Sequence, residues 1–369
     1  MRLRQGPWSQ QSGGRAAGAA APARPTMDGM GTGTVAGARR LRISGARRLT
    51  VSPLAFERIA WVAVWVLVVT IVSGAAVRLT GSGLGCPDWP NCTATHVVAP
   101  WQFHAWVEFG NRLINAAVSI AAIGALGAAL RRRPRRRDLT WLSTGLMVGL
   151  FAEVALGAVL VKEKLAPALV SAHFLLGLVF LADAVVLHHR AGIPDSIERT
   201  KRVALVDRPT VAMSRLMLIG TAVVATLGTV VTSTGPHGGD PSAPRFRFSL
   251  HAVAQVHGTA VEAFLLITVV ALWNLARTGA PRLVIRRAQV LLGALALQGA
   301  VGYAQYLNGD PVALVAIHVA GASIVVLAVV RYYLSLWARA EPSPADGVDR
   351  PETEGALAPA GASSLAPGI

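Results

Sequence analysis

Long apolar stretches recur along this chain, each separated from the next by a short polar or charged segment. A helix that crosses a bilayer needs about 20 mainly apolar residues. The hydrophobic content of 53% is also above that of ordinary soluble domains. We therefore predict an all-α membrane protein with eight transmembrane helices, at residues 59–79, 108–130, 139–161, 168–188, 216–234, 252–274, 288–307 and 312–336.

The Lys and Arg residues are sorted by side, which changes how the net charge of +16 is interpreted. A single basic patch would favour a nucleic-acid partner. Instead, most of the 35 cationic residues lie before the first helix, after each even-numbered helix, or in the C-terminal segment. The opposite side holds only Lys162, Lys164, Arg245, Arg247, Arg78 and Arg112. By the positive-inside rule we predict that both termini are cytoplasmic, with membrane lipid and no nucleic acid as partner.

Both ends of the chain are too polar to pack, and we predict disorder at 1–57 and 340–369. The N-terminal segment is rich in Arg and has no apolar stretch long enough for a signal peptide. It also resembles a mitochondrial transit peptide, but the Ala, Arg, Gly and Pro bias of the whole chain favours the plasma membrane of a bacterium. Met27 and Met30 are alternative translation starts.

An internal repeat divides the eight helices into two halves of four. An offset of 145 pairs Glu153 with Gln298, Gly157 with Gly302 and His173 with His318. An offset of 154 pairs Gly74 with Gly228 and Gly81 with Gly235. Four spans return the chain to the same side, so the halves are parallel. We predict halves at 58–190 and 215–339, joined by a cytoplasmic linker at 191–214.

Three histidines stand alone in apolar stretches: His173, His257 and His318. An intramembrane imidazole is costly to bury and needs a partner. All three fall five to seven residues after a predicted helix start, or about 7 to 10 Å below the outer surface. A layer of this kind in a helix bundle suits haem ligation. The alternative is that each ring only bonds a neighbouring helix.

The fourth position of this layer is not a histidine. The repeat places the counterpart of His257 near residue 111, which is Asn111. His104 lies two helical turns earlier on the same face and is a candidate substitute ligand.

Three charged residues lie near the same outer surface. Glu108 is one turn before Asn111, so its carboxyl group could hold a proton beside a bound substrate. The alternative is that Glu108 only stabilises the helix, because a negative charge is favoured near a helix N-terminus. Arg78 and Arg112 suit pairing with haem propionates, and the alternative is that they extend to lipid head groups.

The only two cysteines, Cys86 and Cys92, share the first outer loop. Its oxidising side favours a disulfide, although a thiol pair or half of a metal site has the same spacing. A structural and a redox role both stay open.

The chain resembles the haem A synthase family, on motifs that span roughly residues 58–339. They are AAVRLTGSGLGCPDWPNC, VEFGNR, SAHFLLG, TSTGPHGGD, VHGTA and QYLNGDPVALVAIHVAG. The family usually has Glu-x-x-His-Arg on its second helix, where this chain has Glu108, Asn111 and Arg112.

The resemblance implies that the chain oxidises the C8 methyl group of haem O to a formyl group by successive hydroxylations, for cytochrome oxidase biogenesis. It implies a haem b cofactor between His257 and His318 and a substrate site at His173, with Glu108 as the acidic residue needed for catalysis. The cysteine pair matches a family version that carries one. Haem O synthase, cytochrome oxidase assembly factors and a second copy of the chain are the protein partners we consider.

Two other functions compete with this one. A di-haem membrane electron-transfer protein of the cytochrome b type predicts paired histidines in both halves. A transporter with parallel repeats predicts helix-breaking Pro or Gly in mid-span, whereas Pro167 and Pro311 lie at helix starts.

Overall fold

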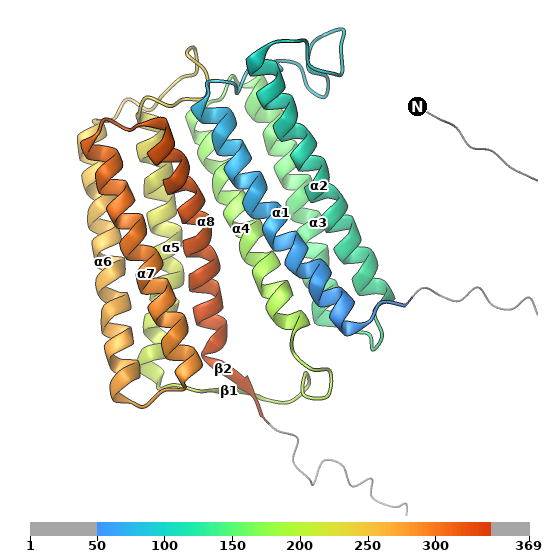
Figure 1. Ribbon diagram of the computed structural model, residues 1–369, viewed down its shortest axis with the longest axis vertical. Helices are drawn as coiled ribbons and strands as arrows, with labels where there is room; N and C mark the ends of the chain where they lie inside the picture. The colour runs from blue at the N-terminus through green and yellow to red at the C-terminus, as the bar shows by residue number, and fades with distance from the viewer. Residues whose placement is uncertain (1–49, 341–369) are drawn as a thin grey trace, which may run out of the picture. The chain divides into compact units, whose positions relative to one another are not determined.

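The computed structural model describes residues 50–340, which form eight long helices and a two-stranded antiparallel ribbon (Figure 1). The helices are α1 (Pro53–Leu79), α2 (Phe103–Arg131), α3 (Arg137–Lys162), α4 (Pro167–Ala191), α5 (Arg208–Thr234), α6 (Leu250–Arg277), α7 (Arg282–Leu307) and α8 (Val312–Ser335). The ribbon pairs β1 (Arg202–Ala204) with β2 (Trp337–Arg339). All eight helices are long and apolar enough to cross a membrane, which confirms the predicted fold class. The predictions for residues 1–49 and 341–369 lie outside the described residues.

Each helix begins at or before its predicted start, and at α1, α5 and α6 a polar capping residue begins the helix ahead of the apolar stretch. Asp207 caps α5 by accepting a 3.2 Å hydrogen bond from the Thr210 N–H, so α5 begins eight residues earlier than predicted. Ser52 caps α1 in the same way, and a proline follows it. Residues 53–57 and 208–214, which we had placed in the extension and the linker, are therefore helical.

Each half is a closed ring of four helices. α1 contacts α2 and α4, and α3 contacts the same two helices; α5 to α8 repeat this pattern. Within residues 50–340 the diagonal pairs, α2 with α4 and α6 with α8, make no direct contact. The two rings lie side by side in Figure 1, joined through α1, α4, α5 and α8.

The apolar core fills only one end of the rings. We call this end the arginine-rich side, because it carries the loop 131–136 between α2 and α3 and the linker 192–207; the other end is the disulfide side, with Cys86 and Cys92. The main cluster of buried residues lies in the half of each helix nearer the arginine-rich side, as with Phe56, Leu181 and Tyr332. Few side chains are buried in the other half of each helix. The predicted histidine layer lies in this less densely packed half.

Hydrogen bonds join the two rings on the disulfide side. The Arg78 guanidinium donates to the backbone carbonyls of His237 at 2.7 Å and Thr232 at 3.0 Å. The Gly83 N–H donates to the Gly239 carbonyl at 2.8 Å, and Gly239 has a φ of 99°, which favours glycine. On the arginine-rich side, the ribbon pairs β1, which lies in the linker between the two rings, with β2, which follows the last helix.

Candidate functional site

One structural unit occurs four times in the disulfide-side halves of the helices. In each unit a polar side chain on an even-numbered helix lies against a glycine on the helix before it. The four pairs are Asn111 with Gly74, His173 with Gly157, His257 with Gly228 and His318 with Gly302. These side chains are six to eight residues after their helix starts, so they form one layer about 9 to 12 Å deep.

The glycines let the rings approach the neighbouring helix closely. A Cβ built on Gly228 would lie 3.1 Å from Cε1 of His257. A Cβ built on Gly302 would lie at the same distance from Cε1 of His318. A Cβ built on Gly157 would lie 3.6 Å from Cε1 of His173, which is an ordinary van der Waals distance. The second half therefore holds its two imidazoles more tightly than the first half holds its one.

The buried nitrogen of each imidazole is Nδ1. In His173, Nδ1 lies 2.6 Å from Oε2 of Glu153, one turn before Gly157 on α3. Nδ1 of His257 and of His318 is also buried, and neither makes a hydrogen bond within the described residues. A polar group at Nδ1 that leaves Nε2 accessible is the usual arrangement for a histidine that binds iron. Glu153, which the repeat pairs with Gln298, thus contacts the site.

The second half fits a haem held by two histidines. His257 and His318 lie at one depth on diagonal helices whose backbones do not pack against each other. Within residues 50–340 no three His, Cys, Asp or Glu side chains gather as a protein-bound metal ion requires. A porphyrin already supplies four ligands to its iron, so two imidazoles are sufficient.

The first half offers a weaker set of ligands. Asn111 lies in the fourth position, where its Nδ2 donates a 2.8 Å hydrogen bond to Oγ of Ser73 on α1. His104, the alternative ligand, lies at the start of α2 and pairs with Ser82 at 2.9 Å. Seven helical residues separate it from Asn111, about 10 Å along the axis, so it lies outside the layer.

Glu108 is buried beneath the cysteine loop, with 6% of its surface exposed. Cys86 and Cys92 form a disulfide, as expected from the resemblance. Oε2 of Glu108 accepts a 2.7 Å hydrogen bond from the Cys86 N–H, and Oε1 accepts one of 2.7 Å from Arg112. Arg112 also donates to the carbonyls of Cys86 and Asn91. The loop, the carboxylate and the guanidinium therefore form one buried unit.

Neither arginine expected at the propionates is free of protein partners. Arg112 binds the cysteine loop, and Arg78 binds the other ring. The prediction that they bind propionates stays untested. Neither set of contacts was predicted from the sequence, although Glu108 and Arg112 are four residues apart on a helix, a spacing typical of an ion pair.

Comparisons with known proteins agree with the fold. The family profile described as cytochrome oxidase assembly protein matches residues 57–330. Heme A synthase of Geobacillus kaustophilus is 39% identical over 100 residues, which cover 26% of this chain and 30% of the relative. Heme A synthase of Shewanella oneidensis is 26% identical over 180 residues, covering 42% and 51%.

The aligned segments thus span about a third to a half of the length of these curated relatives. The relatives are bacterial, and the eight helices are those of a multi-pass membrane protein. The match to the family profile covers most of the chain and extends from α1 to α8. This chain belongs to the COX15-CtaA family of cytochrome oxidase assembly proteins.

Proposed function

We propose that this chain is a haem A synthase, which oxidises the C8 methyl group of haem O to a formyl group by successive hydroxylations and loss of water. The observation that carries the proposal is the asymmetry of one layer: two histidines in the second ring, and His173 opposite Asn111 in the first. Relatives with this name support it. A resident cofactor benefits from two strong ligands, whereas a substrate must be released.

In the proposal the second ring holds haem b through Nε2 of His257 and His318. When bound, this haem would supply one-electron transfer. The chain's own contribution is to hold each of the two imidazoles against a glycine of the preceding helix. The sparse burial around the layer leaves the Nε2 side of both rings accessible.

The first ring binds haem O, with His173 facing the iron and Asn111 on the opposite side. Glu153 would orient the His173 ring through Nδ1. Glu108 lies one helical turn from Asn111 toward the disulfide side and would hold a proton near the reacting methyl group. The hydrogen bonds that it accepts from the Cys86 N–H and from Arg112 fix the position of this carboxyl group.

We also propose that the arginine-rich side faces the cytoplasm, on the strength of the positive-inside rule. The disulfide at Cys86 and Cys92 supports this orientation, because disulfides persist on the oxidising side of a membrane. Reporter domains fused to the 131–136 loop and to the 86–92 loop test it, and activity of a cytoplasmic reporter only in the second loop would contradict it.

The test of function is pigment analysis of the full chain, produced in a bacterial host that makes haem O but no haem A. We expect haem b and haem A in the purified protein, identified by absorbance and mass. His257→Ala and His318→Ala should each lose haem b, whereas Glu108→Ala should keep haem b and make no haem A. His251→Ala is the matched control, on the same helix as His257 but outside the layer, and should behave as wild type.

Two results would contradict the proposal. Protein that carries haem b but never yields haem A, even with haem O present, would favour the di-haem electron carrier. Protein without any haem would exclude both functions.

A further inference from the structure

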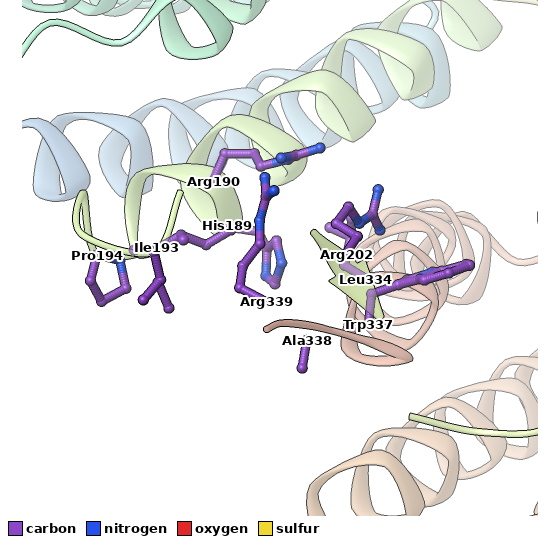
Figure 2. A pocket seen from close by; sticks show the side chains of 11 residues that line it. His189, Arg190, Ile193, Pro194, Arg202, Leu334, Trp337, Ala338 and Arg339 are labelled. Atoms are coloured by element: carbon purple, nitrogen blue, oxygen red, sulfur yellow. The ribbon is translucent and has the colours of Figure 1, made fainter. Parts of the chain in front are cut away.

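A small pocket lies on the arginine-rich side, away from the histidine layer and outside the proposed activity. It is lined by the end of α4, the linker after it, β1, and the end of α8 with β2 (Figure 2). Its volume is about 190 Å³, below the roughly 300–1,000 Å³ of sites that enclose a whole small molecule. A pocket of this size suits one small group of a larger ligand.

The pocket concentrates positive charge. Arg190, Arg202 and Arg339 line it together with His189, and Figure 2 shows the three arginines around the histidine ring. Burial and the neighbouring charge of Arg190 lower the pKa of the Arg202 guanidinium, and Arg339 adds to this effect. Arg202 is therefore close enough to be repelled by both of the other cations.

No acidic side chain within residues 50–340 pairs directly with these three arginines, although Oε1 of Glu57 would lie only 3.2 Å from a Cβ built on the lining residue Gly192. No carboxylate oxygen of that range lies within 4.0 Å of the three guanidinium groups. Asp195, which follows the lining residue Pro194, is already paired with Arg132 at 2.9 Å and Arg136 at 3.6 Å. An anion from outside this part of the chain would remove the repulsion.

Two of the arginines are held in place. The Arg202 guanidinium stacks 4.9 Å above the Trp337 ring, and Arg339 donates a 2.7 Å hydrogen bond to the Thr200 carbonyl. A guanidinium has five N–H donors, so both keep donors for a ligand. Arg190 makes no side-chain hydrogen bond to the rest of the described chain. A prearranged set of guanidinium groups is the usual binding site for phosphate.

The position of the pocket indicates where the phosphate comes from. It lies at the ends of two transmembrane helices, and Trp337 is a residue type that gathers at membrane surfaces. Basic pockets between transmembrane helices bind the head groups of anionic lipids. Ile193 and Leu334 add apolar surface beside the arginines.

We propose that this pocket binds the head-group phosphate of one anionic glycerophospholipid. Such a ligand would contact α4 and the linker on one side and β2 on the other, and so would join the two halves of the chain.

The test is native mass spectrometry of the purified full chain titrated with dioleoyl phosphatidylglycerol. We expect one saturable site in the wild type. Combined Arg190→Gln, Arg202→Gln and Arg339→Gln should weaken it by about tenfold or more, given the contribution of each basic residue to anionic lipid binding. Arg190→Gln alone removes no hydrogen bond within the described chain and should still weaken binding severalfold, which guards against misfolding of the triple variant.

The matched control is combined Arg277→Gln, Arg282→Gln and Arg286→Gln. This variant removes three charges from the same side of the protein, and one of these arginines, Arg277, is also stacked on a tryptophan, Trp273. It should leave binding of the lipid at the pocket unchanged. Equal weakening by both triple variants would overturn the proposal. Equal binding of dioleoyl phosphatidylcholine would also overturn it, and so would displacement of the lipid by inorganic phosphate at matched concentration, which would indicate a soluble ligand.

Discussion

The backbone N–H of Cys86 donates a 2.7 Å hydrogen bond to Oε2 of Glu108, so the cysteine loop directly positions the buried carboxylate. The same carboxylate is held from the other side by Arg112, which also donates to the Cys86 carbonyl. The loop contributes backbone groups to this unit, and the disulfide between Cys86 and Cys92 limits how far those groups can move. In the proposed haem A synthase, the disulfide would therefore act through Glu108.

Combined Cys86→Ser and Cys92→Ser should lower haem A formation without loss of haem b. Opening a loop this short costs roughly 2 kcal/mol by the chain-entropy relation, enough to loosen the loop but not to unfold eight helices. The measurement is the ratio of haem A to haem O in extracted pigment, with the haem b absorbance of the same sample as internal control. An unchanged ratio would show that the loop holds Glu108 without the disulfide.

Gly228→Ala and Gly302→Ala should each weaken haem b retention. The new Cβ would lie 3.1 Å from Cε1 of the facing imidazole, so the ring must move, at a cost of about 1–3 kcal/mol. The measurement is haem b per chain after dialysis. Gly293→Ala, on α7 with no atom within 4 Å of its Cβ, is the control and should retain wild-type haem. Equal retention in all three variants would mean that the contacts do not position the ligands.

The predicted helices and the predicted layer came from features that are local in the sequence. Hydropathy locates the spans, and the repeat together with helix geometry places His173, His257 and His318 at one depth. The repeat also identifies the glycines, because Gly157 and Gly302 share the offset of His173 and His318. What the repeat could not show is which side chain each glycine faces.

The contacts that join distant segments were not predictable from periodicity. Arg78 donates to backbone carbonyls of the other half, and any residue type there would offer the same acceptor. The β1–β2 ribbon pairs strands of three residues each, too short for an alternating pattern to be recognised. Helix starts were placed late for a related reason, since Asp207 and Ser52 begin helices through polar caps that a hydropathy scan does not detect.

Asp207, which caps the start of α5, should make the stability of the protein depend on pH. Hydrogen bonds from Thr210 and Asn274 hold the pKa of this partly buried carboxyl below its ordinary value. The contribution of Asp207 to the free energy of unfolding is therefore complete above the ordinary pKa of about 3.9. It is lost as the pH falls through the lower pKa that the carboxyl has in the folded state. Asp207→Asn, which keeps a capping side chain, should unfold at a lower temperature than wild type at pH 7, and this difference should shrink near pH 3.

The measurement is thermal unfolding in detergent at both pH values. A difference between wild type and Asp207→Asn that is the same at pH 7 and pH 3 would contradict the assignment. Glu198→Gln, also in the linker between the halves, is a control that removes an acidic charge without touching the cap.

Asn111→His should convert the first ring into a second bis-histidine site. The new imidazole would lie in the layer diagonal to His173, with Gly74 behind it as Gly228 lies behind His257. Because two imidazoles hold haem iron more strongly than one, we expect haem content to rise toward two per chain and haem A release to slow severalfold. Haem stoichiometry, the low-spin absorbance and single-turnover product release measure these effects. Ser119→His, two turns further along α2, adds the same group outside the layer and should change none of them; within residues 50–340 the Ser119 hydroxyl bonds only to the Asn115 backbone carbonyl. If Asn111→His left haem content unchanged and sped up product formation, Asn111 would not mark the releasable site, and the asymmetry between the rings would need another cause.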